Sequence, residues 1–114
     1  MTITMPRGDL RPVRFTVCGE DGGETDLQFD EIYFTVKASY NDARYKFQKR
    51  LTRGDIERLE DGSYQFAIRP EDTDGLMMSK YVFDIELVLG EEIKQTTVGE
   101  LILTSEVTHA ADEV

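Results

Sequence analysis

Few side chains in this sequence could carry covalent or acid–base chemistry. The chain has one cysteine, Cys18, and one histidine, His109. A nucleophilic thiol needs a base beside it, and no histidine lies near Cys18 in the sequence. One thiol and one imidazole are also too few for a structural zinc site, and a lone cysteine forms no internal disulfide. The sequence therefore predicts a protein that is not an enzyme, with no catalytic residue, cofactor or metal centre.

Two acidic clusters, at residues 20–26 and 71–74, have the oxygen ligands that calcium prefers. Neither has the spacing of an EF-hand loop. In a chain with a formal net charge of -10, acids on loops are usually solvated. We expect solvated loops at both places, and calcium binding stays open as the alternative.

The tripeptide Arg-Gly-Asp occurs twice, at residues 7–9 and 53–55. An adhesion motif of this kind must be displayed at the tip of an exposed loop. Gly-Asp is also a common turn dipeptide, and each copy precedes an expected ordered element. We interpret both copies as turns.

Large rings are predicted on a solvent-facing surface around the Asn41-Asp42 turn. These rings are Tyr33, Tyr40, Tyr45 and Phe47. The same segment concentrates positive charge in an otherwise acidic chain, through Lys37, Arg44, Lys46, Lys49 and Arg50. Exposed rings often mark an interface, although cross-strand pairing that only stabilises a hairpin would also explain them.

From this segment the sequence predicts a docking surface. Its candidate residues are Tyr33, Tyr40, Arg44, Tyr45 and Lys46. Contact through a surface of mixed rings and charges should weaken with salt.

Length and charge narrow the class of protein. The 114 residues suit one domain, predicted over 1–104, followed by a flexible tail at 105–114. The chain carries 23 Asp plus Glu against 13 Lys plus Arg, which argues against binding to nucleic acid or to anionic lipid. No signal peptide and no apolar run near the ~20 residues of a membrane span is expected.

Hydrophobic residues alternate with polar ones along most of the chain, as strands buried on one face require. The alternation predicts strands at 12–18, 27–38, 44–50, 63–69, 80–89, 93–98 and 100–104, with 2–5 as an extra edge piece. One-turn helical connectors are expected at 53–60 and 70–76. The alternation changes phase near Asp30-Glu31 and near Gly99, which predicts a bulge or corner at the first and a bulge at the second.

Regular short strands of this kind favour a sandwich over strand–helix–strand units. About seven strands in ~100 residues are typical of an immunoglobulin-like architecture. The predicted fold class is all-β, an immunoglobulin-like antiparallel β-sandwich with one-turn helical connectors.

A family resemblance adds detail to this fold. The segment 64–73, followed by 81–85, is similar to the strand E to strand F passage of immunoglobulin-like domains. The resemblance implies that Tyr81 forms a tyrosine corner and that Phe83 takes the core position two residues later. It also implies that Tyr64, Phe66 and Ile68 face Tyr81, Phe83 and Ile85 from the opposite sheet.

Over residues 7–104, the order of strand and turn signals resembles the small immunoglobulin-like domains of phage and prophage structural proteins. These include the N-terminal domain of phage baseplate upper proteins. The resemblance implies a non-catalytic tail, baseplate or head-associated module that contacts other phage structural proteins or itself. It would reside in the virion or the bacterial cytoplasm. The alternative is a small carbohydrate-binding or cell-surface-binding sandwich, which would need surface aromatics around a shallow polar patch.

Overall fold

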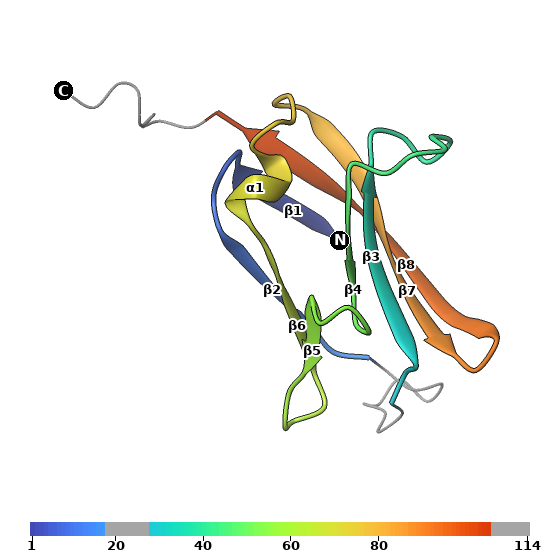
Figure 1. The fold of residues 1–114 in the computed structure, drawn as a ribbon. Coiled ribbons are helices and arrows are strands. Elements are labelled where there is room, and N and C mark those ends of the chain that lie inside the picture. The colour runs from blue at the N-terminus through green and yellow to red at the C-terminus, as the bar shows by residue number, and fades with distance from the viewer. Residues whose placement is uncertain (18–27, 106–114) are drawn as a thin grey trace.

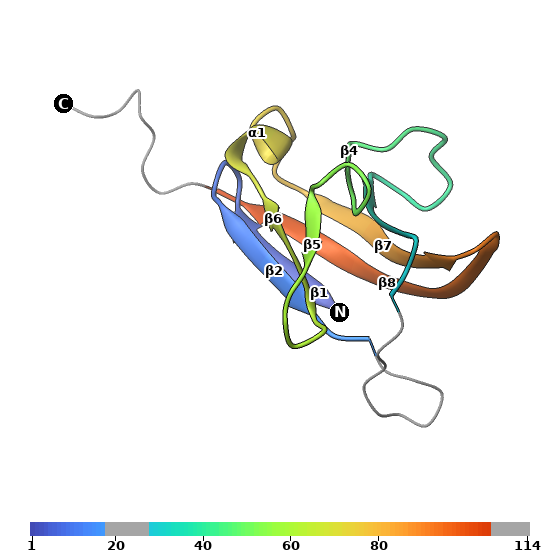
Figure 2. The ribbon, with the colours of Figure 1, turned by 60° about the horizontal axis from the view of Figure 1, so that its bottom comes forward.

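Two β-sheets lie face to face in the computed structural model, which describes residues 1–17 and 28–105 (Figures 1 and 2). The larger sheet has the order β1 (Thr2–Pro6), β8 (Glu92–Thr104), β7 (Lys80–Leu89), β3 (Glu31–Lys37) and β4 (Phe47–Arg50). The smaller sheet has the order β2 (Arg11–Phe15), β6 (Tyr64–Ile68) and β5 (Ile56–Arg58). The predicted all-β sandwich is therefore confirmed.

Strand pairing is antiparallel except at one edge, where β1 runs parallel to β8. The antiparallel pairing predicted for the sandwich strands is present, and the one parallel pair involves the extra edge piece. After β1 the chain crosses to the smaller sheet to form β2, so β1 does not pair with its neighbour in sequence. The expected edge piece at 2–5 is the strand β1.

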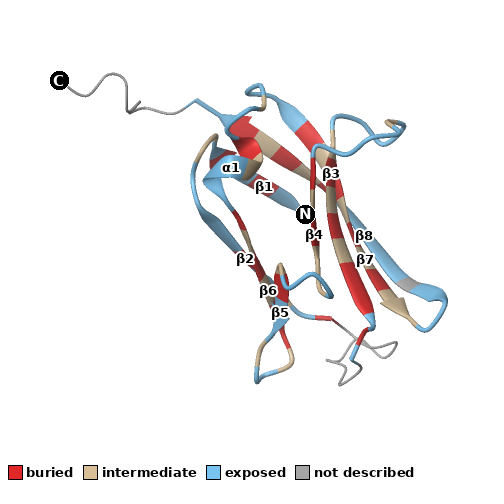
Figure 3. Cartoon of the chain, viewed as in Figure 1, coloured by how far each residue is buried: buried red, intermediate tan, exposed pale blue. Residues whose placement is uncertain are grey.

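The core fills the space between the sheets, where buried and more exposed residues alternate along the strands (Figure 3). The side chains expected to face each other across the sandwich are all buried: Tyr64, Phe66 and Ile68 on β6, and Tyr81, Phe83 and Ile85 on β7. Phe34 of β3 connects the two layers, since its ring centroid lies 4.4 Å from that of Phe66 and 5.1 Å from that of Phe83.

The segment 53–60 is not the predicted helical turn, because Ile56–Arg58 forms β5 beside β6. Ile56 and Leu59 have helical spacing, but Ile56 is buried opposite Phe66, and burial against the core outweighs local preference. The other expected connector is a helical turn, α1 (Pro70–Thr73), which is shorter than predicted. Among the described residues, no helix is long and apolar enough to cross a membrane.

The two strands expected at 93–98 and 100–104 are one continuous strand, β8. No bulge occurs at Gly99, which pairs in register with Phe83. The irregularity lies instead between Leu87 and Val88, opposite Gln95 and Ile93. Gly99 is required for close packing, because a Cβ there would lie 2.5 Å from both Phe83 Cζ and the Met1 carbonyl oxygen.

The strand predicted at 44–50 begins only at Phe47, and residues 38–46 form a loop. Phe47 was wrongly placed on the solvent-facing side. It is buried opposite Val36, with its ring 6.1 Å from that of Phe34. The corner expected near 30–31 is a bend at Asp30, directly before β3. Leu27 and Cys18, which belonged to predicted strands, lie outside the described residues, as does the tail from residue 106 onward.

Candidate interaction site

The loop 38–46 places aromatic rings at the outer face of the larger sheet. A turn closes the loop, with the Ser39 backbone N–H donating to the Asp42 carboxylate at 3.1 Å and the Asp42 N–H donating to the Ser39 carbonyl at 3.1 Å. From this loop, the Tyr40 hydroxyl donates to the Gly99 carbonyl of β8 at 3.4 Å. Tyr40 therefore connects the loop beside β3 to β8, on the far side of β7.

A groove of about 280 Å³ lies on this face, between Tyr33 and Tyr45. Tyr33 is opposite Glu86 in the strand register, and Thr35 is opposite Asp84, so these four side chains share the outer face. The lining also includes Gln48, whose amide donates to the Thr35 hydroxyl at 3.0 Å, and Lys37. The lining of the groove thus combines two tyrosines with an amide, an ammonium group and two carboxylates.

Neither carboxylate of the groove has an ion-pair partner within 4.0 Å among the described residues. Burial raises the pKa of Asp84, an effect that Lys37 partly opposes. Burial also raises the pKa of Glu86, and the charge of Asp84 raises it further. Both carboxylates are thus partly removed from water, and the charge of Lys37 compensates for this burial only in part.

The structure brings Tyr33 and Tyr45 together at the groove and places Tyr40 at an adjoining hollow beside Lys37 and Val82. Tyr40 and Tyr45 are 56% and 50% exposed, which makes them accessible to a partner. The other two candidate residues, Arg44 and Lys46, are exposed but do not line the groove. Three of the five candidate residues, Tyr33, Tyr40 and Tyr45, therefore lie around the groove and the adjoining hollow, and docking through them stays a prediction.

The predicted cluster of positive charge is smaller than expected, because two of its members have partners within the molecule. Lys49 points into the sandwich and pairs with Asp72 of α1 at 2.6 Å. Arg50 pairs with Glu31 at 3.0 Å and lies over the Tyr33 ring, 5.0 Å from its centroid. Three basic residues of the segment, Lys37, Arg44 and Lys46, have no such ion pair in the described part of the chain.

Glu31 joins the start of β3 to the turn after β4. Its carboxylate accepts hydrogen bonds from the Ile32 N–H at 3.0 Å, the Thr52 N–H at 3.1 Å, the Thr52 hydroxyl and the Arg50 guanidinium. Burial alone would raise the pKa of Glu31, but these hydrogen bonds outweigh burial and lower the pKa to about 2. Glu31 is therefore a structural carboxylate that holds Arg50 beside Tyr33.

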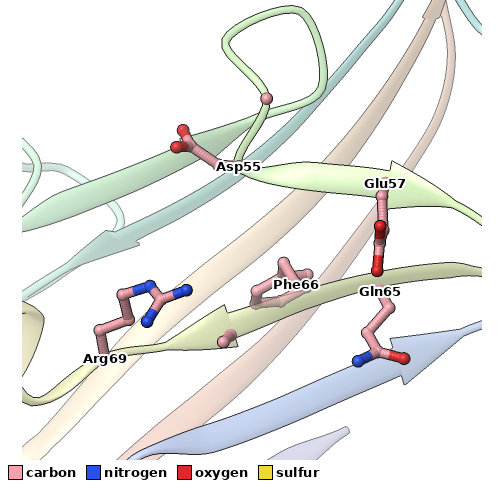
Figure 4. Close-up of a pocket in the computed structure, with 7 residues that line it drawn as sticks. Asp55, Glu57, Gln65, Phe66 and Arg69 are labelled. Carbon is pink, nitrogen blue, oxygen red and sulfur yellow. The ribbon is translucent and has the colours of Figure 1, made fainter.

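A second pocket, also of about 280 Å³, lies on the smaller sheet near Asp55, Glu57, Gln65 and Arg69 (Figure 4). Figure 4 shows the Glu57 and Gln65 side chains close together on neighbouring strands, with Arg69 toward the other end of the pocket. Asp55 already accepts hydrogen bonds from the Arg53 guanidinium and from the Arg50 N–H. Burial raises the pKa of Asp55, but these bonds outweigh burial and lower it.

The Arg-Gly-Asp copy at 53–55 covers the open edge of β4. Arg53 donates to the Gln48 carbonyl, and Asp55 accepts from the Arg50 N–H at 3.1 Å. Gly54 allows the turn, with φ at +88°. In the copy at 7–9, Gly8 also has a positive φ, and its N–H donates to the Thr73 hydroxyl at 2.9 Å. Both copies form turns, as predicted.

Within residues 1–17 and 28–105, no three His, Cys, Asp or Glu side chains gather as a metal site would require. In the acidic cluster 71–74, Asp72 pairs with Lys49 and accepts from the Arg69 N–H at 2.8 Å. The cluster 20–26, Cys18 and His109 lie outside the described residues.

Asp84 and Glu86 lie in the strand predicted at 80–89, but the sequence pattern did not identify them as part of the site. Gln48 was missed as well. The alternation in 81–89 was the available signal, but the strand pairing that brings these acids beside Tyr33 is visible only in the fold.

Comparison of this chain with protein-family models and with curated proteins finds no match. The interpretation of the site therefore rests on its own geometry.

Proposed function

We propose that this domain is a non-catalytic contact module of a phage or prophage structural protein. It binds a protein partner through the outer face of the larger sheet. The observation that carries the proposal is the meeting of Tyr33, Tyr40 and Tyr45 on one accessible face around a polar groove. Tyrosine provides a large, rigid contact area and a hydroxyl, which is why it is enriched at protein interfaces.

The extent of this face supports a protein partner. Tyr40 lies outside the groove and reaches across to β8. Val98 of β8 is 55% exposed, and it belongs to the outward-facing set because its neighbour Gly99 faces the core. Exposed rings and apolar side chains thus continue across the sheet beyond the groove itself, as a broad docking surface requires.

Two features support the immunoglobulin-like part of the proposal. The orders β2-β6-β5 and β8-β7-β3-β4 match strands B-E-D and G-F-C-C′ of an immunoglobulin-like sandwich. The Tyr81 hydroxyl donates to the Met77 carbonyl at 2.7 Å, which is the contact expected of a tyrosine corner. The phage context rests on the sequence resemblance, and with it the placement in a virion or in the bacterial cytoplasm.

The test is an association measurement with matched variants. Sedimentation velocity is measured for the chain alone and mixed with the purified products of the adjacent structural genes. Tyr40→Ala with Tyr45→Ala should abolish any complex, whereas Leu10→Ala with Met77→Ala removes exposed apolar area elsewhere and should not. Equal association of both double variants with the same partner contradicts the proposal.

One observation favours a second candidate function, glycan binding. The lining of the groove combines two tyrosine rings with an amide and two carboxylates, and such side chains can bind sugar hydroxyls. Retention of the chain on cell-wall polysaccharide, lost in Tyr45→Ala, would favour this function over protein contact.

A further inference from the structure

The groove between Tyr33 and Tyr45 has more negative than positive charge in its lining. Asp84 and Glu86 contribute two carboxylates, and Lys37 contributes one ammonium group. Arg50, the other cation near Tyr33, is engaged by Glu31. A ligand with one positive charge would balance the groove.

The two tyrosine rings differ in what already covers them. The Arg50 guanidinium lies 5.0 Å from the Tyr33 centroid. This contact shows a guanidinium packed on one of the two rings that line the groove. No ammonium or guanidinium lies over Tyr45 in the described part of the chain, and its ring is half exposed. Tyr45 is therefore the ring that a ligand can cover.

Arginine matches these groups better than lysine does. Its planar guanidinium donates several hydrogen bonds in a fixed fork, which suits carboxylates, and it also stacks on aromatic rings. We propose that the groove binds an arginine side chain of the partner protein, with the guanidinium between the Tyr45 ring and the carboxylates of Asp84 and Glu86. This inference rests on the proposed function, since it names the contact that the partner makes.

The charge of the chain favours a different protein over a second copy as the source of this arginine. Each copy has a formal net charge of -10, so two copies repel each other, most strongly at low salt. A partner with a basic contact surface is attracted under the same conditions. Lowering the salt concentration should therefore strengthen the complex with the partner and weaken any self-association.

The direct probe is acetyl-arginine amide, titrated into the labelled domain and followed by NMR. We expect binding in the millimolar range, on the order of what one small ligand with few contacts can achieve. Signals of Thr35, Tyr45 and Asp84 should shift. Acetyl-citrulline amide has nearly the same shape without the charge and should produce no shift at the same concentration.

The matched variant is Asp84→Asn with Glu86→Gln, which keeps side-chain size and removes both charges. It should bind the arginine probe at least about tenfold more weakly, as expected when a charged hydrogen bond is lost. Glu57→Gln with Glu60→Gln removes the same charge from exposed positions outside the groove and should bind like the parent. Equal melting temperatures of the variants show that any loss is not unfolding.

The inference would be overturned if citrulline bound as tightly as arginine or if Asp84→Asn with Glu86→Gln bound arginine as tightly as the parent. It would also be overturned if arginine shifted NMR signals elsewhere in the molecule instead of those of the groove. A neutral glucose trisaccharide is titrated in parallel, and groove shifts with the sugar but not with arginine would overturn it in favour of glycan binding. Failure of the proposed function is seen separately, as partner association that does not depend on Tyr40 and Tyr45.

Discussion

The outer faces of the two sheets have pockets of the same size and similar composition but of different chemical character. Each measures about 280 Å³, and each combines two carboxylates with one basic side chain. In the pocket of the smaller sheet, Asp55 has a lowered pKa and accepts bonds from Arg53 and the Arg50 N–H. In the groove of the larger sheet, both carboxylates have raised pKa values and no ion-pair partner among the described residues.

Residue types alone therefore do not distinguish a surface whose charges are used within the fold from one whose charges are open to a ligand. A carboxylate that is already engaged within the fold stabilises the fold. A carboxylate held partly out of water without a partner gains from a ligand that supplies one.

The largest effect should come from the core that both faces share. Phe83 belongs to the inner face of the larger sheet and Phe66 to the inner face of the smaller one. The rings of both pack on Phe34. Phe83→Ala and Phe66→Ala should each lower the free energy of unfolding by about 3–5 kcal/mol, measured by chemical denaturation. A loss below about 1 kcal/mol for either would show that its face does not rest on this common core.

Gly99→Ala should be the next most damaging change. The added methyl would meet the Phe83 ring and the Met1 backbone, and backbone cannot move aside as a flexible side chain can. We expect a loss of about 3 kcal/mol by chemical denaturation. Gly75→Ala, where the Cβ would meet nothing within 4 Å, is the control and should change stability little.

Glu31→Gln should lower stability at neutral pH by about 2 kcal/mol, because Arg50 and Thr52 lose a charged acceptor. The folded pKa of about 2 is below the ordinary value of 4.5, so ionised Glu31 stabilises the fold above pH 4.5. This contribution is lost as the pH falls toward 2. The difference in stability between parent and variant should therefore shrink as the pH falls from 4.5 toward 2. A difference that stays constant over this pH range would contradict the stabilising role of ionised Glu31.

The smallest effects compare the two faces directly. Asp55→Asn should destabilise the protein by about 1 kcal/mol, since a charged acceptor is replaced by a neutral one. Asp84→Asn should leave stability at pH 7 unchanged or slightly raised. Because the folded pKa of Asp84 is raised, the parent should gain stability relative to this variant as the pH falls. Thermal unfolding at pH 7 and pH 4 measures the stability of both variants. Equal losses of stability in Asp55→Asn and Asp84→Asn would contradict the difference between the two faces.

Much of the fold could be predicted from the sequence, because alternation reports which face of a strand is buried. The pattern identified β6 and β7 with their inward residues, the corner at Asp30 and the helical turn at Pro70. It misassigned 53–60, since three residues are too few for alternation to outweigh a helical spacing. It also wrongly predicted a bulge at Gly99. Glycine is needed there because a Cβ would meet the Phe83 ring on the neighbouring strand and the Met1 backbone.

The candidate site was predicted in part. Its tyrosines could be found because rings on polar strand faces stand out in a sequence. The inward direction of Phe47 and Lys49 could not be predicted from the exposed ring of Tyr45, because Tyr45 belongs to the loop and the strand begins only at Phe47. The contribution of Asp84 and Glu86 depends on which strand lies beside which, and pairing partners leave no local signal.

The cap on β4 by Arg53 and Asp55 affects how copies of this domain behave when crowded together. An uncovered strand edge can recruit another edge and lead to amyloid-like aggregation. Here side chains of the same molecule already occupy the Gln48 carbonyl and the Arg50 N–H. Domains packed at high local density would then remain separate at this edge, which leaves the tyrosine face as the proposed place of contact.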